Sequence, residues 1–210
     1  MWKLFCVIFG LFTATMLHAA PLILIYGDSL SAAYGLPANQ GWGALLGQRL
    51  APDYRVVNAS VSGETTAGGL ARLDNALRQH QPTLVLLELG ANDALRGLPL
   101  GQAETNLGNM LQKIRAAGAS SLLIGMRLPP NYGPLYTKQF SDMYQRLANQ
   151  HNSALMPFLL EGFADQADYF QADGIHPNAK AQPLIAEQVK KQIVALQQRP
   201  AEKKSRNSKR

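Results

Sequence analysis

Short apolar runs alternate along the chain with segments in which apolar residues recur at helical spacing. The runs have the length of buried strands and lie at residues 22–26, 54–58, 83–89, 121–126 and 154–156. A helical segment follows each run, at residues 42–50, 70–79, 105–117, 139–150 and 179–197. Gly118 stands directly after the third helical segment, where the end of a helix favours glycine. The pattern therefore predicts five strand–helix units.

Continuously apolar strands that alternate with helices predict an α/β fold with a parallel sheet covered on both faces. Right-handed crossovers between such strands build a doubly wound, five-stranded sheet. We expect one domain over residues 20–197. Because ligands bind at the carboxyl ends of strands in this architecture, we expect the chemistry in loops that directly follow strands.

The start of the chain has the pattern of a secretory signal peptide. Lys3 precedes an uncharged apolar stretch at 4–17, which ends in small residues at Ala19 and Ala20. The stretch is shorter than the ~20 residues that a membrane-spanning helix needs. We therefore expect a signal peptide at 1–19, cleaved after Ala19 or Ala20, and a periplasmic or secreted protein.

The only cysteine, Cys6, lies inside this segment. The mature chain would then have no disulfide, no cysteine–zinc site and no thiol nucleophile. No histidine and carboxylate cluster has the spacing of metal ligands. Phosphate-loop and dinucleotide-binding fingerprints are absent from the sequence, as is the Gly-x-Ser-x-Gly elbow. We expect neither a metal nor a cofactor.

The composition is that of a globular protein, with 47% hydrophobic and 16% charged residues among 210. The formal charge is +6, but residues 199–210 carry +5 and Lys3 carries one more, so residues 4–198 are neutral overall. The charge is therefore no argument for nucleic-acid binding. The composition of residues 198–210 predicts a basic disordered tail. This tail is either simply solvated or makes a weak contact with an anionic membrane surface.

Polar residues concentrate in three loops after predicted strands and in a fourth segment near the end of the chain. These segments are GDSLS at 27–31, NASVSGE at 58–64, GAND at 90–93 and DGIHPN at 173–178. Because the carboxyl ends of parallel strands meet at one edge of the sheet, we expect the first three segments to lie close together.

The segments contain the residue types of a serine hydrolase. A serine needs an imidazole to take its proton, and the imidazole needs an acid to orient it. Ser29, Ser60 and Ser62 all suit the nucleophile, and all suit a turn. We expect Asp28 to serve the turn around Ser29. Asn92 could donate to an oxyanion or stand in a plain turn.

The histidines of the mature chain narrow the choice of base. His80 and His151 stand at predicted helix ends, where polar residues are ordinary. His176 has Asp173 three residues before it and Pro177 after it. That spacing can place a carboxylate against the ring, and it also fits a helix-capping turn.

Taken together, GDSLS, the glycine at 63, GAND and DGIHPN resemble the four sequence blocks of the SGNH (GDSL) hydrolases. NASVSGET, LELGANDALRG and RLPPNYG further resemble the bacterial periplasmic acyl hydrolases of that family, which include thioesterases, lysophospholipases and arylesterases. The similarity spans about residues 21–195. It implies a three-layer α/β/α, flavodoxin-like fold and a triad of Ser29, His176 and Asp173.

The resemblance also implies the remaining parts of the site. The oxyanion hole would combine the backbone N–H groups of Ser29 and Gly63 with the side-chain amide of Asn92. The loop at 91–98 would move on substrate binding, and Leu128 would border an acyl groove. Further apolar candidates for that groove are Leu95, Leu98 and Tyr132. The chain departs from the family at 32–40 (AAYGLPANQ) and in its basic tail.

These observations lead us to expect an exported, monomeric serine acyl hydrolase. Its substrates would be small-molecule thioesters, lysophospholipids and short-to-medium-chain carboxylic esters. An alternative is a carbohydrate esterase that removes acetyl groups on the same scaffold. A further alternative is a non-enzymatic protein that binds anionic surfaces through its tail.

Overall fold

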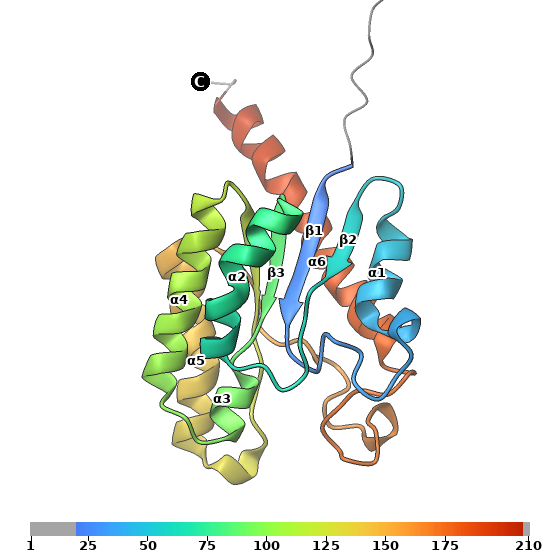
Figure 1. The fold of residues 1–210 in the computed structure, drawn as a ribbon, viewed down its shortest axis with the longest axis vertical. Coiled ribbons are helices and arrows are strands. Elements are labelled where there is room, and N and C mark those ends of the chain that lie inside the picture. Colours follow the sequence, from blue (N-terminus) through green and yellow to red (C-terminus); the bar gives the residue numbers. More distant parts are fainter. Residues whose placement is uncertain (1–19, 208–210) are drawn as a thin grey trace, which may run out of the picture.

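The computed structural model describes residues 20–207, with side chains to residue 198 (Figure 1). The predicted signal peptide at 1–19 lies outside the described residues. Within residues 20–207, no helix combines the length and the apolar content needed to cross a membrane.

One parallel sheet organises the chain, as the alternation of strands and helices predicts. Its strands, in the spatial order β2-β1-β3-β4-β5, confirm the flavodoxin-like arrangement. The order reverses between β1 and β3, and the carboxyl ends of these two strands form the switch point of the sheet. The strands are β1 (Leu22–Gly27), β2 (Arg55–Asn58), β3 (Leu84–Glu88), β4 (Ser120–Ile124) and β5 (Ala154–Met156).

Helices cover both faces of the sheet and complete the three layers (Figure 1). On one face lie α1 (Trp42–Leu50) and α6 (Gln182–Asn207), and on the other lie α2 (Thr66–His80), α4 (Leu100–Ala116) and α5 (Pro134–His151). A short helix, α3 (Ala91–Leu95), follows β3 at the carboxyl edge. Single 3-10 turns lie at η1 (Ala38–Gln40), η2 (Pro130–Tyr132) and η3 (Ala167–Tyr169).

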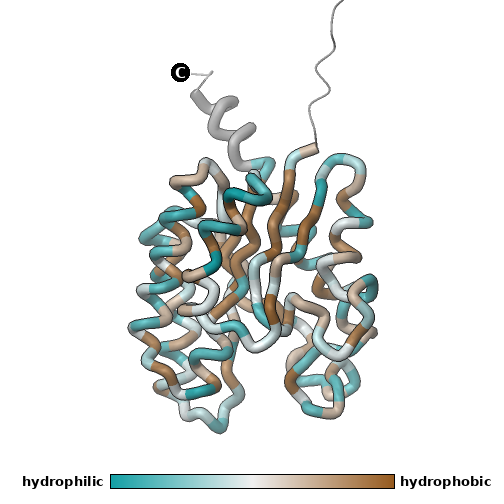
Figure 2. The backbone as a smooth tube through the Cα atoms, in the orientation of Figure 1, coloured by the Kyte–Doolittle hydropathy of each residue, from teal (hydrophilic) through white to brown (hydrophobic). Residues whose placement is uncertain are grey.

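The centre of the sheet is apolar on both sides. Every residue of β1 is buried, and Figure 2 shows the hydrophobic colouring concentrated along the strands. Trp42, at the start of α1, is fully buried, and its indole N–H donates to Leu30 O at 3.1 Å. Its backbone N–H donates to the Gln182 side chain at 2.9 Å. The core thus holds the loop after β1 against the first turns of α1 and α6.

Several helices begin earlier than the periodicity predicts. The side chain of Thr65 caps α2 by accepting from Gly68 N, and Asp93 accepts from Thr66 N at 2.8 Å. Helix α4 begins after Pro99 and α5 begins at Pro134, both before the predicted starts. Helix α3 was not predicted at all, because five residues are too few to show periodicity. The predicted helix end at Gly118 is confirmed by its φ of 81°.

Helix α6 continues beyond residue 197, where the sequence predicts the helix to end. Its backbone is helical to Asn207, although the composition of 198–210 predicts a disordered tail. Ala, Glu, Lys and Arg in this stretch are strong helix formers, whereas Pro200 has no N–H to donate to the carbonyl four residues earlier. Residues 208–210 lie outside the described part of the chain.

The packing makes a direct prediction about Leu86, which is fully buried in the middle strand β3. Leu86→Ala should lower the free energy of unfolding by about 2–5 kcal/mol, because it leaves a cavity between sheet and helices. Urea titration followed by circular dichroism measures the change. Leu184→Ala is the matched control, since Leu184 on α6 is 39% exposed. Equal losses from the two substitutions would contradict this packing.

Candidate active site

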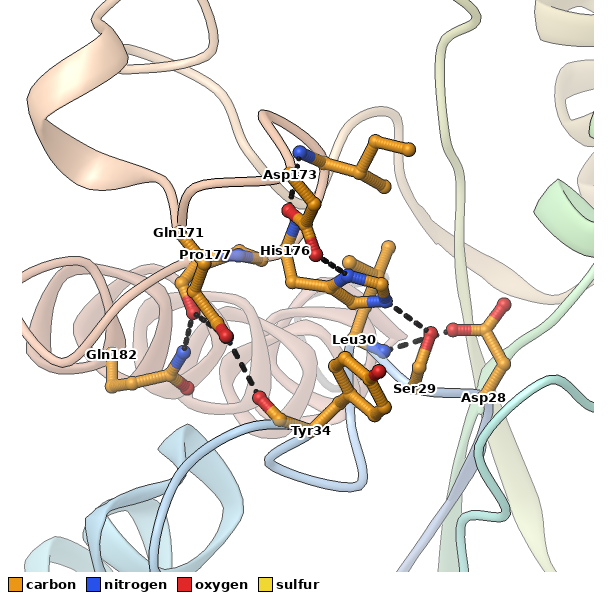
Figure 3. Close-up of polar contacts among 10 residues, drawn as sticks. Asp28, Ser29, Leu30, Tyr34, Gln171, Asp173, His176, Pro177 and Gln182 are labelled. Atoms are coloured by element: carbon orange, nitrogen blue, oxygen red, sulfur yellow. Dashed lines mark hydrogen bonds and ion pairs between the residues drawn. The ribbon is translucent and has the colours of Figure 1, made fainter.

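Three of the predicted site residues form a hydrogen-bonded row at the carboxyl edge of the sheet (Figure 3). Ser29 lies in the loop after β1, and its Oγ is 2.9 Å from His176 Nε2. His176 Nδ1 is 2.7 Å from Asp173 Oδ2. The structure therefore brings together residues that are far apart in sequence, with the imidazole between the hydroxyl and the carboxylate.

Asp173 is held as an anion by its own turn. Its Oδ1 accepts from His176 N at 3.0 Å and from Ile175 N at 2.9 Å. These backbone hydrogen bonds, with a smaller contribution from the His176 ring, lower the pKa of Asp173 to about 2. An ionised carboxylate only accepts hydrogen bonds, so the imidazole carries its proton on Nδ1. Nε2 is then free to accept the Ser29 proton.

The loop that carries His176 is fastened to its surroundings by backbone and side-chain hydrogen bonds. Gln171 N donates to His176 O at 2.8 Å, and Asn178 N donates to Tyr169 O at 2.8 Å. The Gln182 side chain on α6 donates to Pro177 O at 3.1 Å. The ring of His176 therefore stands on a loop fixed from both ends.

Asn92 lies on α3, and its side chain reaches toward the loop after β1 that carries Ser29. Its Nδ2 donates to Asp28 Oδ2 at 3.0 Å, while Asp28 Oδ1 accepts from Leu30 N at 3.0 Å. The second contact confirms that Asp28 serves the turn around Ser29. An amide has two N–H donors, so one of them remains for another acceptor after the bond to Asp28.

Asn92 is positioned by a buried network beneath α3. The neighbouring Asp93 accepts from Thr66 Oγ1 at 2.6 Å and from Thr66 N at 2.8 Å. Asn106 on α4 donates to Thr66 Oγ1 at 3.0 Å. Because all three of these side chains are buried and paired, α3 is fixed relative to α2 and α4.

Gly63 lies in the loop after β2, next to the end of β1. That loop is anchored by Val61 N, which donates to Gly27 O at 3.0 Å. Gly63 has a φ of 76°, where other residues are strained, and its carbonyl accepts from Arg96 Nη2 at 2.9 Å. Arg96 follows α3 directly, so it joins the Gly63 loop to the segment that carries Asn92. No pattern in the sequence indicates a role for this arginine.

Two carboxyl groups, those of Asp28 and Glu88, lie buried next to each other at the end of β1, and no sequence pattern predicts this pair. Glu88, at the end of β3, is fully buried, and its Oε2 accepts from Ser31 Oγ at 2.7 Å and from Asp28 N at 3.3 Å. Its Oε1 has no hydrogen-bond partner among the described residues. The one signal was a glutamate inside the apolar run TLVLLEL.

Burial and mutual repulsion control the charges of this pair. Burial raises the pKa of Glu88 well above its usual value, and the Asp28 charge beside it raises that pKa further. Burial also raises the pKa of Asp28 to about 6, against hydrogen bonds from Leu30 and Asn92. Two adjacent buried carboxyls do not both ionise readily, so the folded protein favours the protonated form of Glu88 over its charged form.

The apolar candidates for an acyl groove differ in exposure. Leu128 is buried, Leu95 is partly buried, and Leu98 and Tyr132 are exposed. The Tyr132 hydroxyl donates to Leu95 O at 3.4 Å, which joins the two segments. Of these four residues, Leu128 lines a cavity of about 600 Å³. The other residues that line this cavity are Arg127, Pro130, Pro134, Thr137, Lys138 and Ser141.

The cavity differs from a purely apolar groove because two cations border it. Arg127 pairs with Glu161 at 3.3 Å, and Lys138 pairs with Asp142 on α5. Arg127, Leu128 and Pro130 belong to the segment RLPPNYG at 127–133, whereas Pro134, Thr137, Lys138 and Ser141 belong to α5. Their meeting depends on the path of the chain after β4.

Comparison with known proteins gives consistent results over nearly the whole domain. Residues 25–183 match the GDSL-like lipase/acylhydrolase family. The chain is 54% identical over 178 residues to esterase TesA of Pseudomonas aeruginosa, covering 83% of this chain and 89% of the relative. It is 48% identical to thioesterase 1/protease 1/lysophospholipase L1 of Escherichia coli K12, with 85% and 86% covered.

The fold also matches solved structures. The crystal structure of the psychrotrophic esterase EstA from Pseudoalteromonas sp., inhibited by monoethylphosphonate, superposes with a TM-score of 0.81. The sequence identity is 44%, and the match covers 84% of this chain and 98% of that one. Sequence and fold thus lead to the same family.

The buried carboxyl pair predicts how stability depends on pH. The pKa of Glu88 is higher in the folded protein than its value of 4.5 in the unfolded chain. The contribution of protonated Glu88 to the free energy of unfolding is therefore complete below pH 4.5 and is lost as pH rises through the raised pKa. Glu88→Gln has a similar shape and cannot ionise. As pH rises from about 5 to about 8, the free energy of unfolding of the Glu88→Gln variant should therefore fall less than that of the wild type.

Urea titrations at several pH values measure this difference. Glu187→Gln is the control, because Glu187 of α6 is a half-exposed ion-pair partner of Arg49 of α1 and should leave the pH dependence unchanged. Equal pH dependence in the wild type and in Glu88→Gln would show that Glu88 does not hold a proton in the folded protein.

Proposed function

This chain belongs to the GDSL-like lipase/acylhydrolase family and is an ester and thioester hydrolase, and we propose that it acts through a serine acyl-enzyme. The observation that carries the proposal is the unbroken row of hydrogen bonds from Ser29 through His176 to Asp173. We assign these residues as nucleophile, general base and orienting acid.

In the first step, Ser29 Oγ attacks the acyl carbon of the substrate. His176 Nε2 takes the hydroxyl proton as the Oγ–carbon bond forms, and Asp173 stabilises the resulting imidazolium. Collapse of the tetrahedral intermediate breaks the bond from the acyl carbon to the leaving oxygen or sulfur. His176 gives its proton to that atom, so an alcohol or thiol departs and the acyl group stays on Ser29.

The oxyanion of each tetrahedral intermediate needs donors that are already in position. We assign this role to the backbone N–H groups of Ser29 and Gly63 and to the Asn92 amide. The bond from Asn92 to Asp28 supports the assignment, because it fixes one N–H and orients the other. The hydrogen bond from Arg96 to Gly63 O supports the assignment of Gly63, because it holds the loop that carries the Gly63 N–H.

In the second step, water replaces the leaving group. His176 takes a proton from the water as its oxygen attacks the acyl carbon, and then returns that proton to Ser29 Oγ. The acyl–oxygen bond to Ser29 breaks, and the carboxylic acid is released. These steps run without a cofactor, because the side chains and backbone N–H groups named above supply the nucleophile, the base and the oxyanion donors.

The substrate class follows from the cavity beside Leu128 and the names of the relatives. We propose thioesters, lysophospholipids and short-to-medium-chain esters as substrates, because a relative is named thioesterase and lysophospholipase. The acyl chain would contact Leu128, with Leu95, Leu98 and Tyr132 along the side of the site. Removal of acetyl groups from carbohydrate is the alternative, and the polar lining at Thr137 and Ser141 is the observation in its favour.

A series of p-nitrophenyl esters from acetyl to palmitoyl tests the proposal, with a long-chain acyl-CoA beside it. Ser29→Ala should lower kcat by a factor on the order of 10³–10⁶, because only binding and oxyanion stabilisation remain. Asn92→Ala should lower kcat by about 10²–10³. In the wild type, activity should peak at medium or long chains.

Two outcomes would overturn parts of this proposal. Activity that survives in Ser29→Ala would show that another residue is the nucleophile. Activity confined to acetyl esters would favour the carbohydrate esterase. Ser120→Ala, at the exposed first residue of β4 and outside the cavity beside Leu128, is the control and should keep the wild-type activity profile.

We further propose that the protein is exported and acts as a monomer. The charged start, apolar stretch and small residues of the first twenty positions support export. Expression of the full chain should give a protein whose first residue is Ala20 or Pro21, recovered from the periplasm or the medium. Sequencing of its N-terminus checks this, and an intact Met1 would contradict it.

A further inference from the structure

Tyr34 is a large aromatic residue that lies in the open beside the proposed base. Its side chain belongs to the loop after β1, and the residue is 51% exposed. Its ring centroid lies 4.4 Å from that of His176, with an angle of 37° between the rings (Figure 3). Much of the ring therefore stays in contact with solvent while one part covers the imidazole.

The backbone holds Tyr34 in this position. Tyr34 N donates to Ser29 O at 3.3 Å, within the nucleophile loop. The Gln171 side chain donates to Tyr34 O at 2.7 Å, and the backbone N–H of Gln171 donates to His176 O at 2.8 Å. Gln171 thus holds both the loop that carries His176 and the backbone of Tyr34, which keeps the Tyr34 ring beside the imidazole.

The two sides of Ser29 differ in chemistry. Asp28, which binds the Asn92 amide, lies on one side of Ser29, and His176 and Tyr34 lie on the other (Figure 3). In the proposed reaction the leaving atom must come within hydrogen-bond reach of His176 Nε2. The group attached to that atom then extends along the imidazole, where the exposed part of the Tyr34 ring lies.

We infer that Tyr34 is a specificity residue that contacts the leaving group of the substrate and favours planar, aromatic leaving groups. This inference rests on the proposed function, since it needs His176 to protonate the leaving atom. Offset stacking of two rings stabilises a contact enough to change a rate constant by about 3- to 10-fold. Aryl esters should gain that factor in acylation, whereas alkyl thioesters should not.

The alternative role for Tyr34 is to position the imidazole alone. That role would affect every substrate equally, because the same His176 serves acylation and deacylation. The leaving group is present only in acylation, which determines kcat/KM. The ratio of kcat/KM between two leaving groups on one acyl chain therefore separates the two roles.

The test compares butyrate esters of phenol and of ethanethiol, whose leaving groups have comparable acidity. Tyr34→Leu should lower the ratio of kcat/KM, phenyl ester over thioester, by about 3- to 10-fold. Tyr34→Phe keeps the ring and should keep the wild-type ratio. Val194→Ala, at an exposed position on α6, is the control for an unrelated surface substitution.

Each other outcome counts against the inference. Equal losses of kcat/KM for both esters in Tyr34→Leu, with a lower kcat, would mean that Tyr34 only positions His176. An unchanged ratio without any loss would mean that Tyr34 does not contact the leaving group. Ser29→Ala is measured in the same series, and activity surviving there would refute the proposed function itself, whatever the ratio shows.

Discussion

The pairing of β1 with β3 is the constraint on which the site depends. The two strands lie in parallel register, with Gly27 opposite Glu88 at their carboxyl ends. Both strands are buried in an apolar core, and a shift of one residue would turn their side chains to the opposite face. The register therefore fixes how the loop with Ser29 lies beside the loop with Asn92. A side chain at Gly27 would meet Glu88 Oε2 at 2.6 Å, so this close approach requires glycine.

Carboxyl groups take different charge states in this small region because their surroundings differ. Asp173 lies in an exposed turn, and backbone N–H groups stabilise its anion. Glu88 lies in the core, where one of its oxygens has no hydrogen-bond partner in the described part of the chain, and burial there favours the protonated form. Asp173 is thus suited to orient the His176 imidazole, while Glu88 holds the loop after β1 by accepting a hydrogen bond from Ser31. Environment, and not residue type, sets the two roles.

The residues of the site come from two separate groups of loops, which lie on opposite sides of Ser29 (Figure 3). Loops after β2 and β3 bring Gly63 and Asn92, joined through Arg96. The loop before α6 brings His176, and Gln171 fastens it to Tyr34 on the nucleophile loop. The proposed oxyanion donors and the proposed leaving-group contact therefore come from different parts of the chain. Substitutions on one side can change selectivity without rebuilding the other.

The sequence by itself determined how the five strands alternate with the longer helices. It also made Ser29, Asp173 and His176 candidates for a triad, with Ser60 and Ser62 as alternative nucleophiles until the family resemblance favoured Ser29. Apolar periodicity is a local property, and Asp173 and His176 are close enough in sequence to meet within one turn. The early start of α2, the short helix α3 and the charge state of Glu88 were decided by tertiary structure. Each depends on a partner distant in the chain, such as Asp93 for Thr66 and Asp28 for Glu88. The same holds for Tyr34, whose place beside His176 arises only when the sheet brings the first and last loops together. No local pattern records such contacts, because burial and hydrogen bonding between distant segments exist only in the folded chain.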